Sequence, residues 1–261
     1  MERLKGKRAI VTGAGSGIGR ATAIRFASEG AAVLAVGRTR ENIEETVSII
    51  SEQGGIADAF VADATKESDI SGSVDYCVEK LGGLEIFFAN AGNTDSFVSL
   101  LDQTVEAWET QFRDNTISAF LGVKYAGRHM KTTGYGSIVL NSSTGSLRAN
   151  GGTAAYSACK AAVNSLTMNA ANAFAGTQIR VNAVLPGLCE TKLTASTFEM
   201  ARARGSESKM GQLTTLKRTG RVEEIAAVVA FLASDDSSYM DGQLLAADGG
   251  ISSTHPYGRF A

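Results

Sequence analysis

The sequence alternates short apolar runs with helical patterns along nearly its whole length, and this alternation most constrains its fold. Strand-like runs are expected at 8–11, 31–36, 56–61, 84–88, 137–140, 179–184 and 243–247. Helical patterns fall at 17–29, 40–52, 70–81, 104–130, 153–174 and 222–233. Near-continuous apolar strands between helices are typical of a parallel sheet covered on both faces. The sequence therefore predicts an α/β, doubly wound fold with a mostly seven-stranded sheet. Its ligand crevice should lie outside the carboxyl ends of the strands.

The chain is long enough for one substantial core, and nothing in its composition divides it. It has 261 residues, of which 44% are hydrophobic and 20% charged. No internal repeat, low-complexity segment or Pro/Ser-rich linker interrupts the alternation. A single domain over residues 1–261 is therefore expected.

Charge and cysteine content argue against several classes of function. Lys and Arg number 25 against 27 Asp and Glu, a net charge of −2, so no field of one sign is present to bind nucleic acid or an anionic membrane. No apolar run approaches the ~18 residues of a membrane span. Three scattered cysteines and two histidines predict neither a disulfide framework nor a metal site. A cytoplasmic protein with a small-molecule partner fits these counts best.

A glycine-rich turn stands where a phosphate-binding loop is expected. Residues 12–19 read Thr-Gly-Ala-Gly-Ser-Gly-Ile-Gly, follow the first strand and open the first helix. Glycines let the backbone approach a pyrophosphate, and the helix N-terminus presents N–H groups and a positive dipole. A purely structural turn is the alternative, because the spacing fits T-G-x-x-x-G-x-G and departs from G-x-G-x-x-G. The candidate contacts for such a group are Gly13, Ser16, Gly17, Ile18 and Gly19.

Tyr156 and Lys160 stand four residues apart in an expected helix, so both lie on one helix face. A phenol has a pKa near ~10, and a neighbouring ammonium favours the phenolate, so the pair is a plausible acid/base. An ordinary surface pair is the alternative. Asn141-Ser142-Ser143 ends the fifth strand, where Ser143 could meet Tyr156 and hydrogen-bond a substrate oxygen. A serine-rich loop with local backbone bonds is the alternative there.

These motifs, taken together and in order, resemble the short-chain dehydrogenase/reductase family. The glycine turn, Ser143 and the Tyr156/Lys160 pair are joined by three further matches. These are Asn90-Ala91-Gly92 after the fourth strand, Asn115 in the next helix, and Pro186-Gly187 with Thr191 after the sixth strand. The resemblance covers roughly residues 5–250 and implies a Rossmann-type fold.

The resemblance implies a role for each matching residue. Tyr156 would be the general acid/base at the substrate oxygen, and Lys160 would lower the Tyr156 pKa and hold the nicotinamide ribose. Ser143 would orient the substrate oxygen and stabilise its developing charge. Asn115 would bend its helix and hold a water in a proton relay with Lys160. The other implied cofactor contacts are Arg38, Asp63, Ala64, Asn90, Ala91, Gly92, Pro186, Gly187 and Thr191.

The end of the second strand favours NADP(H) over NAD(H). An NAD-selective site usually places an acidic residue there, about 20 residues past the glycine turn. This sequence has Gly37 at that position, followed by Arg38, whose guanidinium could pair with a 2′-phosphate. Alternatively, Arg38 caps the strand in solvent or stacks on the adenine, which would allow either cofactor. Ser16 stands where many NADP-selective relatives carry a basic residue.

The implied activity is hydride transfer between a nicotinamide cofactor and a secondary alcohol or its ketone. The alternatives are an NAD(H)-dependent dehydrogenase of a sugar or cyclic alcohol, lyase, epimerase or enoyl-reductase chemistry on the same fold, and a non-catalytic dinucleotide-sensing scaffold. Enoyl reductases of related form space their Tyr and Lys farther apart. A scaffold would be expected to lack Ser143, Tyr156 or Lys160, and this sequence has all three.

The resemblance also implies an assembly and a cover for the site. Helices 104–130 and 153–174 would pair between subunits, with the last strand and tail forming a second interface, so a homotetramer is expected. Residues 188–218 would form a lid over the substrate.

Overall fold

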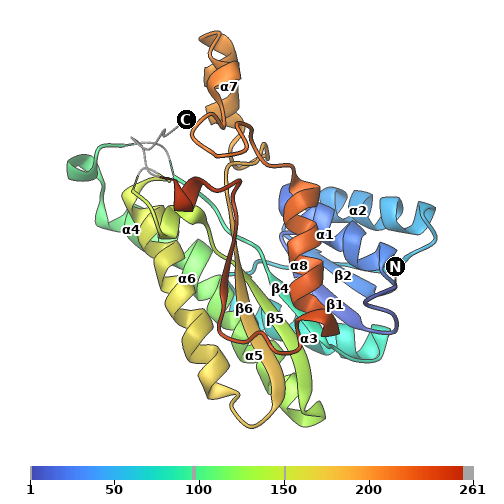
Figure 1. The fold of residues 1–261 in the computed structure, drawn as a ribbon. Coiled ribbons are helices and arrows are strands. Elements are labelled where there is room, and N and C mark those ends of the chain that lie inside the picture. The colour runs from blue at the N-terminus through green and yellow to red at the C-terminus, as the bar shows by residue number, and fades with distance from the viewer. Residues whose placement is uncertain (1, 96–97, 150, 255–261) are drawn as a thin grey trace.

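Seven parallel strands form one sheet at the centre of the molecule (Figure 1). The computed structural model describes residues 2–95, 98–149 and 151–254. The strand order is β3-β2-β1-β4-β5-β6-β7, so the chain starts inside the sheet, builds one edge and then returns to build the other. The strands are β1 (Arg8–Thr12), β2 (Ala32–Gly37), β3 (Ile56–Val61), β4 (Ile86–Ala89), β5 (Tyr135–Asn141), β6 (Gln178–Pro186) and β7 (Leu244–Ala247). The prediction of a doubly wound α/β fold is confirmed.

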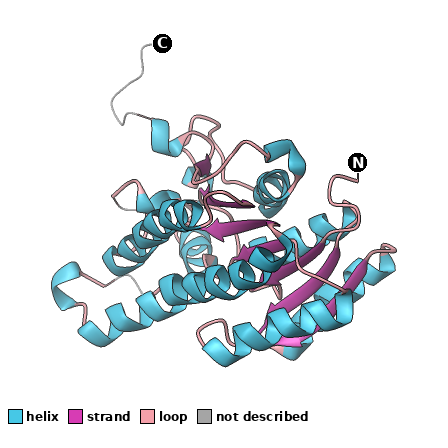
Figure 2. Cartoon of the chain, turned by 90° about the horizontal axis from the view of Figure 1, so that it is seen from below, coloured by secondary structure: helices cyan, strands magenta, loops and turns pink. Residues whose placement is uncertain are grey.

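Helices pack on both faces of this sheet (Figure 2). One face carries α1 (Gly17–Ser28), α2 (Arg40–Glu52) and α8 (Val222–Ala233), and the other carries α3 (Glu67–Leu81), α5 (Ser118–Thr133) and α6 (Ala154–Ala173). Successive residues of a strand point to opposite faces. In β1, Ile10 therefore belongs to one core, while Ala9 and Val11 belong to the other. Both sides of the strand are buried, which explains why the strands are almost continuously apolar.

Several predicted bounds match the structure because the periodicity is clear and turn residues flank it. The expected elements at 40–52, 56–61 and 222–233 are α2, β3 and α8. β5 and β6 extend beyond the apolar runs that predicted them, because the parallel ladder continues through polar residues such as Tyr135 and Gln178.

The expectation of one continuous helix over 104–130 is wrong in its middle. α4 (Val105–Phe112) passes into a π-helical turn at Arg113–Ile117, and α5 follows. The Asn115 side-chain amide donates to the Gln111 carbonyl at 3.0 Å and to the Asn93 carbonyl at 2.9 Å. A side chain therefore occupies the carbonyl that the α-helical N–H of residue 115 would use, and insertion of a side chain into the ladder distorts a helix.

A long excursion separates β6 from α8 and contains a helix that the sequence reading missed. Its two ends are joined by a β-bridge between Cys189 and Gly220, with the Gly220 N–H donating to the Leu188 carbonyl at 2.9 Å. Between them, α7 (Ala195–Ala203) projects from the body of the molecule (Figure 1). In the described part of the chain, no helix combines the length and apolarity that a bilayer crossing requires.

Gly122 sets how closely α5 approaches the sheet. A Cβ placed on Gly122 would lie 2.5 Å from Cε1 of Phe87, a buried residue of β4. Such a contact cannot be accommodated without displacing the Phe87 ring, the helix or both. Gly72 in α3 differs, because its added Cβ would meet Phe60 Cζ at 3.7 Å, an ordinary van der Waals distance.

We therefore expect opposite effects from the same substitution at these two helical glycines. Gly122→Ala should lower the free energy of unfolding by about 1–3 kcal/mol, because overpacking a core costs more than the helix gains. Gly72→Ala should raise it by about 0.5–1 kcal/mol, because alanine loses less backbone entropy in a helix. Urea unfolding measures both. A Gly122→Ala variant as stable as Gly72→Ala would contradict the close packing of α5 on β4.

Candidate active site

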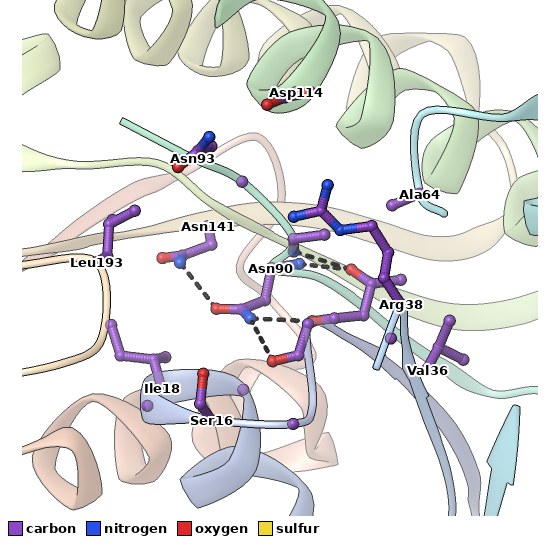
Figure 3. Close-up of a pocket in the computed structure, with 18 of the residues that line it drawn as sticks. Ser16, Ile18, Val36, Arg38, Ala64, Asn90, Asn93, Asp114, Asn141 and Leu193 are labelled. Carbon is purple, nitrogen blue, oxygen red and sulfur yellow. Dashed lines mark hydrogen bonds between the residues drawn. The ribbon is translucent and has the colours of Figure 1, made fainter. Parts of the chain in front are cut away.

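A cavity of about 450 Å³ opens at the carboxyl ends of β1, β2, β4 and β5. It spans the boundary between β1 and β4, where the strand order reverses direction. A parallel α/β sheet binds its ligands at this switch point, because the loops on either side turn away and leave a crevice. Figure 3 shows the residues that surround it, with Ser16 and Ile18 on one side, Arg38 and Ala64 on another, and Asn93 and Asp114 opposite.

The glycine turn lies on one wall of the cavity, and its backbone could not be built with larger residues. Gly13 and Gly17 have φ values of 66° and 52°, in the left-handed region. A Cβ on Gly19 would lie only 2.1 Å from the Gly13 carbonyl oxygen. Ser16 precedes α1 without a side-chain capping bond, so the first N–H groups of the helix face the cavity without that partner. The turn thus presents donors and a positive dipole to a ligand.

A chain of hydrogen bonds joins the ends of β1, β4 and β5 across the floor of the cavity (Figure 3). The Asn90 amide donates to the Thr12 carbonyl at 2.9 Å, and the Asn141 amide donates to Asn90 Oδ1 at 2.9 Å. The Thr12 hydroxyl oxygen also accepts from the backbone N–H groups of Asn90 and Ala91, each at 3.0 Å. These bonds hold the strand ends in one fixed relation.

The same chain continues to Lys160. Its ammonium donates to the Asn141 carbonyl at 2.9 Å, and the residue is only 3% exposed. Burial lowers the Lys160 pKa to about 8. Ser142 positions the helix backbone behind it, because its hydroxyl lies 3.0 Å from the Lys160 carbonyl and 2.6 Å from Asn164 Oδ1.

Tyr156 is half-buried beside Lys160, whose ammonium lies 5.6 Å from the centre of the phenol ring. Thr153 caps this end of α6: its hydroxyl accepts from the Tyr156 N–H at 3.3 Å and donates to Asp95. Burial raises the pKa of Tyr156, and a hydrogen bond with Ser143 opposes that rise. In the protein chain alone, desolvation of the phenolate is the larger effect on the Tyr156 pKa, and the expectation that Lys160 lowers this pKa stays a prediction.

Asn115 lies on the cavity wall and is 1% exposed. Its amide binds the Asn93 carbonyl, and its Oδ1 accepts from the Asn93 N–H at 3.3 Å. A Cβ on Gly92 would come within 2.6 Å of that same oxygen and 3.4 Å of Lys160 Nζ. Asn115 thus packs the loop after β4 against Lys160, and the predicted distortion of its helix is the π-helical turn itself.

The far end of the cavity is formed by the ends of β2 and β3. Arg38 is exposed and reaches over the cavity (Figure 3). Burial raises the pKa of Asp63, but hydrogen bonds from Thr65 and the positive charge of Arg38 outweigh it, so the pKa stays below its usual value. Asp63 Oδ1 accepts from the Thr65 N–H at 3.0 Å and the Thr65 hydroxyl at 2.8 Å. Val36 and Ala64 provide apolar surface beside these charges.

Most of the predicted site residues line this one cavity, and three do not. On its wall lie Gly13, Ser16, Gly17, Ile18, Gly19, Arg38, Asp63, Ala64, Asn90, Ala91, Gly92, Asn115, Tyr156, Lys160 and Thr191. Ser143, Pro186 and Gly187 lie off it. Pro186 accepts from the Thr144 hydroxyl at 3.1 Å, and Gly187 packs against Asp248 beside a second cavity of about 570 Å³.

The sequence reading missed Asn141, Asp114 and Lys192, which also line the cavity. Asn141 belongs to the Asn-Ser-Ser motif already noted, but its importance depends on the pairing of β5 with β4, which the sequence does not specify. Its Oδ1 is buried without a partner in the described residues.

Cys159, next to Lys160, is fully buried, and burial raises its pKa to about 11. A thiol with a raised pKa is a poor nucleophile near neutral pH, since the thiolate is the reactive form. Cys159 therefore packs as a small core residue.

The residues present fit a dinucleotide. The glycine turn and an uncapped helix N-terminus lie at the middle of the cavity. One end is lined by charged and apolar side chains from the ends of β2 and β3. The other end holds a buried lysine and a tyrosine. The unpartnered Asn141 Oδ1 provides a further acceptor beside Lys160. This order of donors, apolar surface and titratable groups matches a phosphate-linked ligand with a reactive end.

Comparison with known proteins identifies the family. A family model described as Enoyl-(Acyl carrier protein) reductase matches residues 13–252. The chain is 38% identical over 249 residues to the 3-oxoacyl-(acyl-carrier-protein) reductase of Thermotoga maritima, covering 95% of this chain and 99% of the relative. It is 38% identical over 256 residues to the 7alpha-hydroxysteroid dehydrogenase of Clostridium sardiniense, covering 96% and 95%. The crystal structure of levodione reductase superposes with a TM-score of 0.92 at 32% identity, covering 97% of this chain and 100% of the other.

The chain belongs to the short-chain dehydrogenase/reductase family. It is accordingly an NAD(P)-dependent oxidoreductase that acts on alcohols or ketones and uses a nicotinamide cofactor.

Proposed function

We propose that the protein is an NADP(H)-preferring enzyme that interconverts a secondary alcohol and its ketone. The observation that carries this proposal is the pairing of the Tyr156 phenol with the buried Lys160 ammonium at one end of the cavity. The Ser143 hydroxyl, which lies off the cavity wall, hydrogen-bonds the phenol. Arg38 lies at the other end. The first group supplies proton transfer, and the second supplies a cation for a 2′-phosphate.

In the reductive direction, the Tyr156 hydroxyl donates its proton to the substrate carbonyl oxygen, which becomes the alcohol oxygen. Ser143 donates a hydrogen bond to the same oxygen and stabilises the charge that develops there. The hydride added to the carbonyl carbon, or removed from it in the reverse direction, would be the chemistry that a nicotinamide dinucleotide held along the cavity supplies. The buried Lys160 ammonium stabilises the phenolate that forms, so its charge matters most during the reaction.

Asn141 and Asn115 hold Lys160 in place, the first by a direct bond and the second through the loop after β4. Asn141 accepts the ammonium bond directly, and Asn115 fixes the loop that packs against it. In this proposal Asn115 also supports the route by which Lys160 returns a proton to Tyr156 through water.

Residues 188–218 form the proposed lid, within one domain that spans 1–261. The Cys189–Gly220 bridge fixes both of its ends, while Leu193, Met200 and Leu213 expose apolar surface that a substrate could cover. The names of the relatives refer to a 3-oxoacyl-(acyl-carrier-protein), a 7alpha-hydroxysteroid and levodione, so the substrate class stays broad. An NAD(H)-dependent dehydrogenase of a sugar or cyclic alcohol is the second candidate. The enoyl-reductase description of the matching model adds an enoyl thioester to the compounds worth testing.

We expect Tyr156→Phe to lower turnover by orders of magnitude while NADPH still binds, because only the proton-transferring hydroxyl is removed. Absorbance at the reduced-nicotinamide band measures turnover on a panel of ketones, alcohols and an enoyl thioester, and fluorescence titration measures binding. Tyr76→Phe is the matched control, because its hydroxyl bonds Asp58 at 2.7 Å, on α3 and β3. Turnover of Tyr156→Phe within a few-fold of the wild type would remove Tyr156 from this role.

The NADP(H) preference rests on Arg38 and on the residue before it. Gly37 provides no carboxylate to repel a 2′-phosphate, and Arg38 forms no ion pair within 4.0 Å among the described residues. Its guanidinium is therefore available for charge-assisted bonds. The positive charge of Arg38 helps to lower the pKa of Asp63, but the Asp63 carboxylate is hydrogen-bonded to the Thr65 hydroxyl and not paired with Arg38.

Arg38→Gln should weaken NADPH binding on the order of tenfold and leave NADH binding nearly unchanged, because the lost bonds involve only the 2′-phosphate. Arg40→Gln is the control: Arg40 lies two residues away, pairs with Glu44 at 3.2 Å and is not on the cavity wall. A substitution at Gly37 would also disturb packing, since a Cβ added there would lie 2.9 Å from Ile43 Cγ2. A wild type that binds NADH more tightly would contradict the preference.

We also propose a homotetramer of a cytoplasmic enzyme. Val105, Ile117, Phe120 and Met168 expose between 42% and 69% of their surface on α4, the π-helical turn, α5 and α6, where one subunit interface is expected. Tyr239, between α8 and β7, is fully exposed and would lie in the second. The tail assigned to that interface, from residue 255 onward, lies outside the described residues. The three buried free thiols suit a reducing compartment.

Light scattering at micromolar concentration should report the mass of four 27.2-kDa chains. Phe120→Asp should shift the mass to smaller species, because it places a carboxylate in an apolar interface. Ile56→Asp, which changes another exposed apolar residue, on β3, should leave the mass unchanged. A monomeric wild type would overturn the assembly but not the activity.

A further inference from the structure

We infer that Lys192 binds the diphosphate that links the two halves of a nicotinamide dinucleotide. The inference rests on the proposed function and adds to it a residue of the lid. Lys192 was not among the residues singled out from the sequence, yet it lines the cavity between Thr191 and Leu193. It would contribute to the binding of NADP(H) and NAD(H) alike.

Hydrogen bonds fix the turn that carries Lys192. The Thr194 hydroxyl donates to the Cys189 carbonyl at 2.7 Å and accepts from the Thr191 N–H at 3.0 Å. The Thr194 N–H in turn donates to the Thr191 carbonyl at 3.1 Å. Residues 191–193 are thereby held at the mouth of the cavity, close to the bridged base of the lid.

This turn faces the phosphate side of the cavity. A Cβ placed on Gly17 would meet Thr191 Cβ and Cγ2, each at 3.2 Å, so Thr191 packs directly against the glycine turn. Lys192 therefore follows a residue that touches the start of α1. The other two cations of the cavity belong elsewhere, since Arg38 follows β2 and Lys160 bonds the end of β5.

The acidic residue nearest to Lys192 in the sequence is paired elsewhere, so the Lys192 ammonium is available to bind an anion. Glu190, two residues before it, pairs with Arg202, and Arg202 also pairs with Glu207. No carboxylate of the described residues lies within ion-pair distance of Lys192, which is exposed. The helix N-terminus offers a diphosphate backbone donors on one side, and Lys192 offers a mobile point charge from the lid side.

The test measures equilibrium binding by fluorescence titration of NADPH and NADH, with ADP-ribose and 2′-AMP as competitors. Lys192→Gln should weaken NADPH, NADH and ADP-ribose by about three- to tenfold and leave 2′-AMP unchanged, because only 2′-AMP lacks the diphosphate. Its affinities should also depend less steeply on salt, since one ionic contact is gone. Lys192→Arg should restore binding by restoring the charge.

Lys209→Gln is the matched control, because it removes the same charge from the same excursion at an exposed position off the cavity wall. Equal binding by Lys192→Gln and wild type would overturn the inference while the proposed function stands. A loss confined to NADPH would overturn it too, because Lys192 would then contact the 2′-phosphate. A substrate KM effect with unchanged cofactor binding would assign it to the substrate instead. A wild type that binds neither dinucleotide overturns both proposals.

Discussion

The structure depends on one chain of hydrogen bonds that runs from Thr12 through Asn90 and Asn141 to Lys160. Three of the seven strands end at this chain, and each link is 2.9 Å long. The two links among Thr12, Asn90 and Asn141 join side-chain amides to carbonyl oxygens and carry no net charge, whereas the third is donated by the Lys160 ammonium. The glycine turn at one end and the buried lysine at the other are thus held at a fixed separation. A ligand that must span both meets a site already arranged for it, which lowers the cost of ordering on binding.

The burial of Lys160 and Tyr156 gives this fixed geometry its chemical character. Desolvation raises the pKa of the phenol and lowers that of the ammonium, so in each case burial disfavours the charged form. In an enzyme whose phenol gives up a proton during the reaction, the phenol should be neutral at rest and a nearby cation should stabilise the phenolate when it forms. The Ser143 hydroxyl then acts in the opposite direction to burial, since its bond favours the phenolate. The sequence showed the pair and its spacing, but only the burial reveals which effect is larger.

Sequence reasoning reached the fold because the determining signals are local. Ile43 and Ile50 repeat at helical spacing in α2. Ala9, Ile10 and Val11 alternate between the two cores, so a continuous apolar run is enough to indicate a strand buried on both faces. It failed where an element depends on contacts distant in the chain. The π-helical turn requires Asn115 to reach Asn93, which is 22 residues away in sequence. Asn141 gains its role from a bond to Asn90, 51 residues away. Arg148, in the loop after β5, bonds the Ile251 carbonyl and the Thr254 hydroxyl, 103 and 106 residues away.

The site thus has one part whose residue positions are determined by the sheet and another part whose residue positions are not. The residues proposed to hold the cofactor sit at strand ends, where the register of the sheet determines their positions. The proposed substrate side consists of the 188–220 excursion and the loop after β5. That loop doubles back so that Gly145 packs against Gly151, and Arg148 ties it to Ile251 and Thr254. Neither segment adds a strand to the sheet, so both can change in sequence without altering the strand ends. This separation is compatible with relatives whose names refer to substrates as different as a 3-oxoacyl-(acyl-carrier-protein), a 7alpha-hydroxysteroid and levodione.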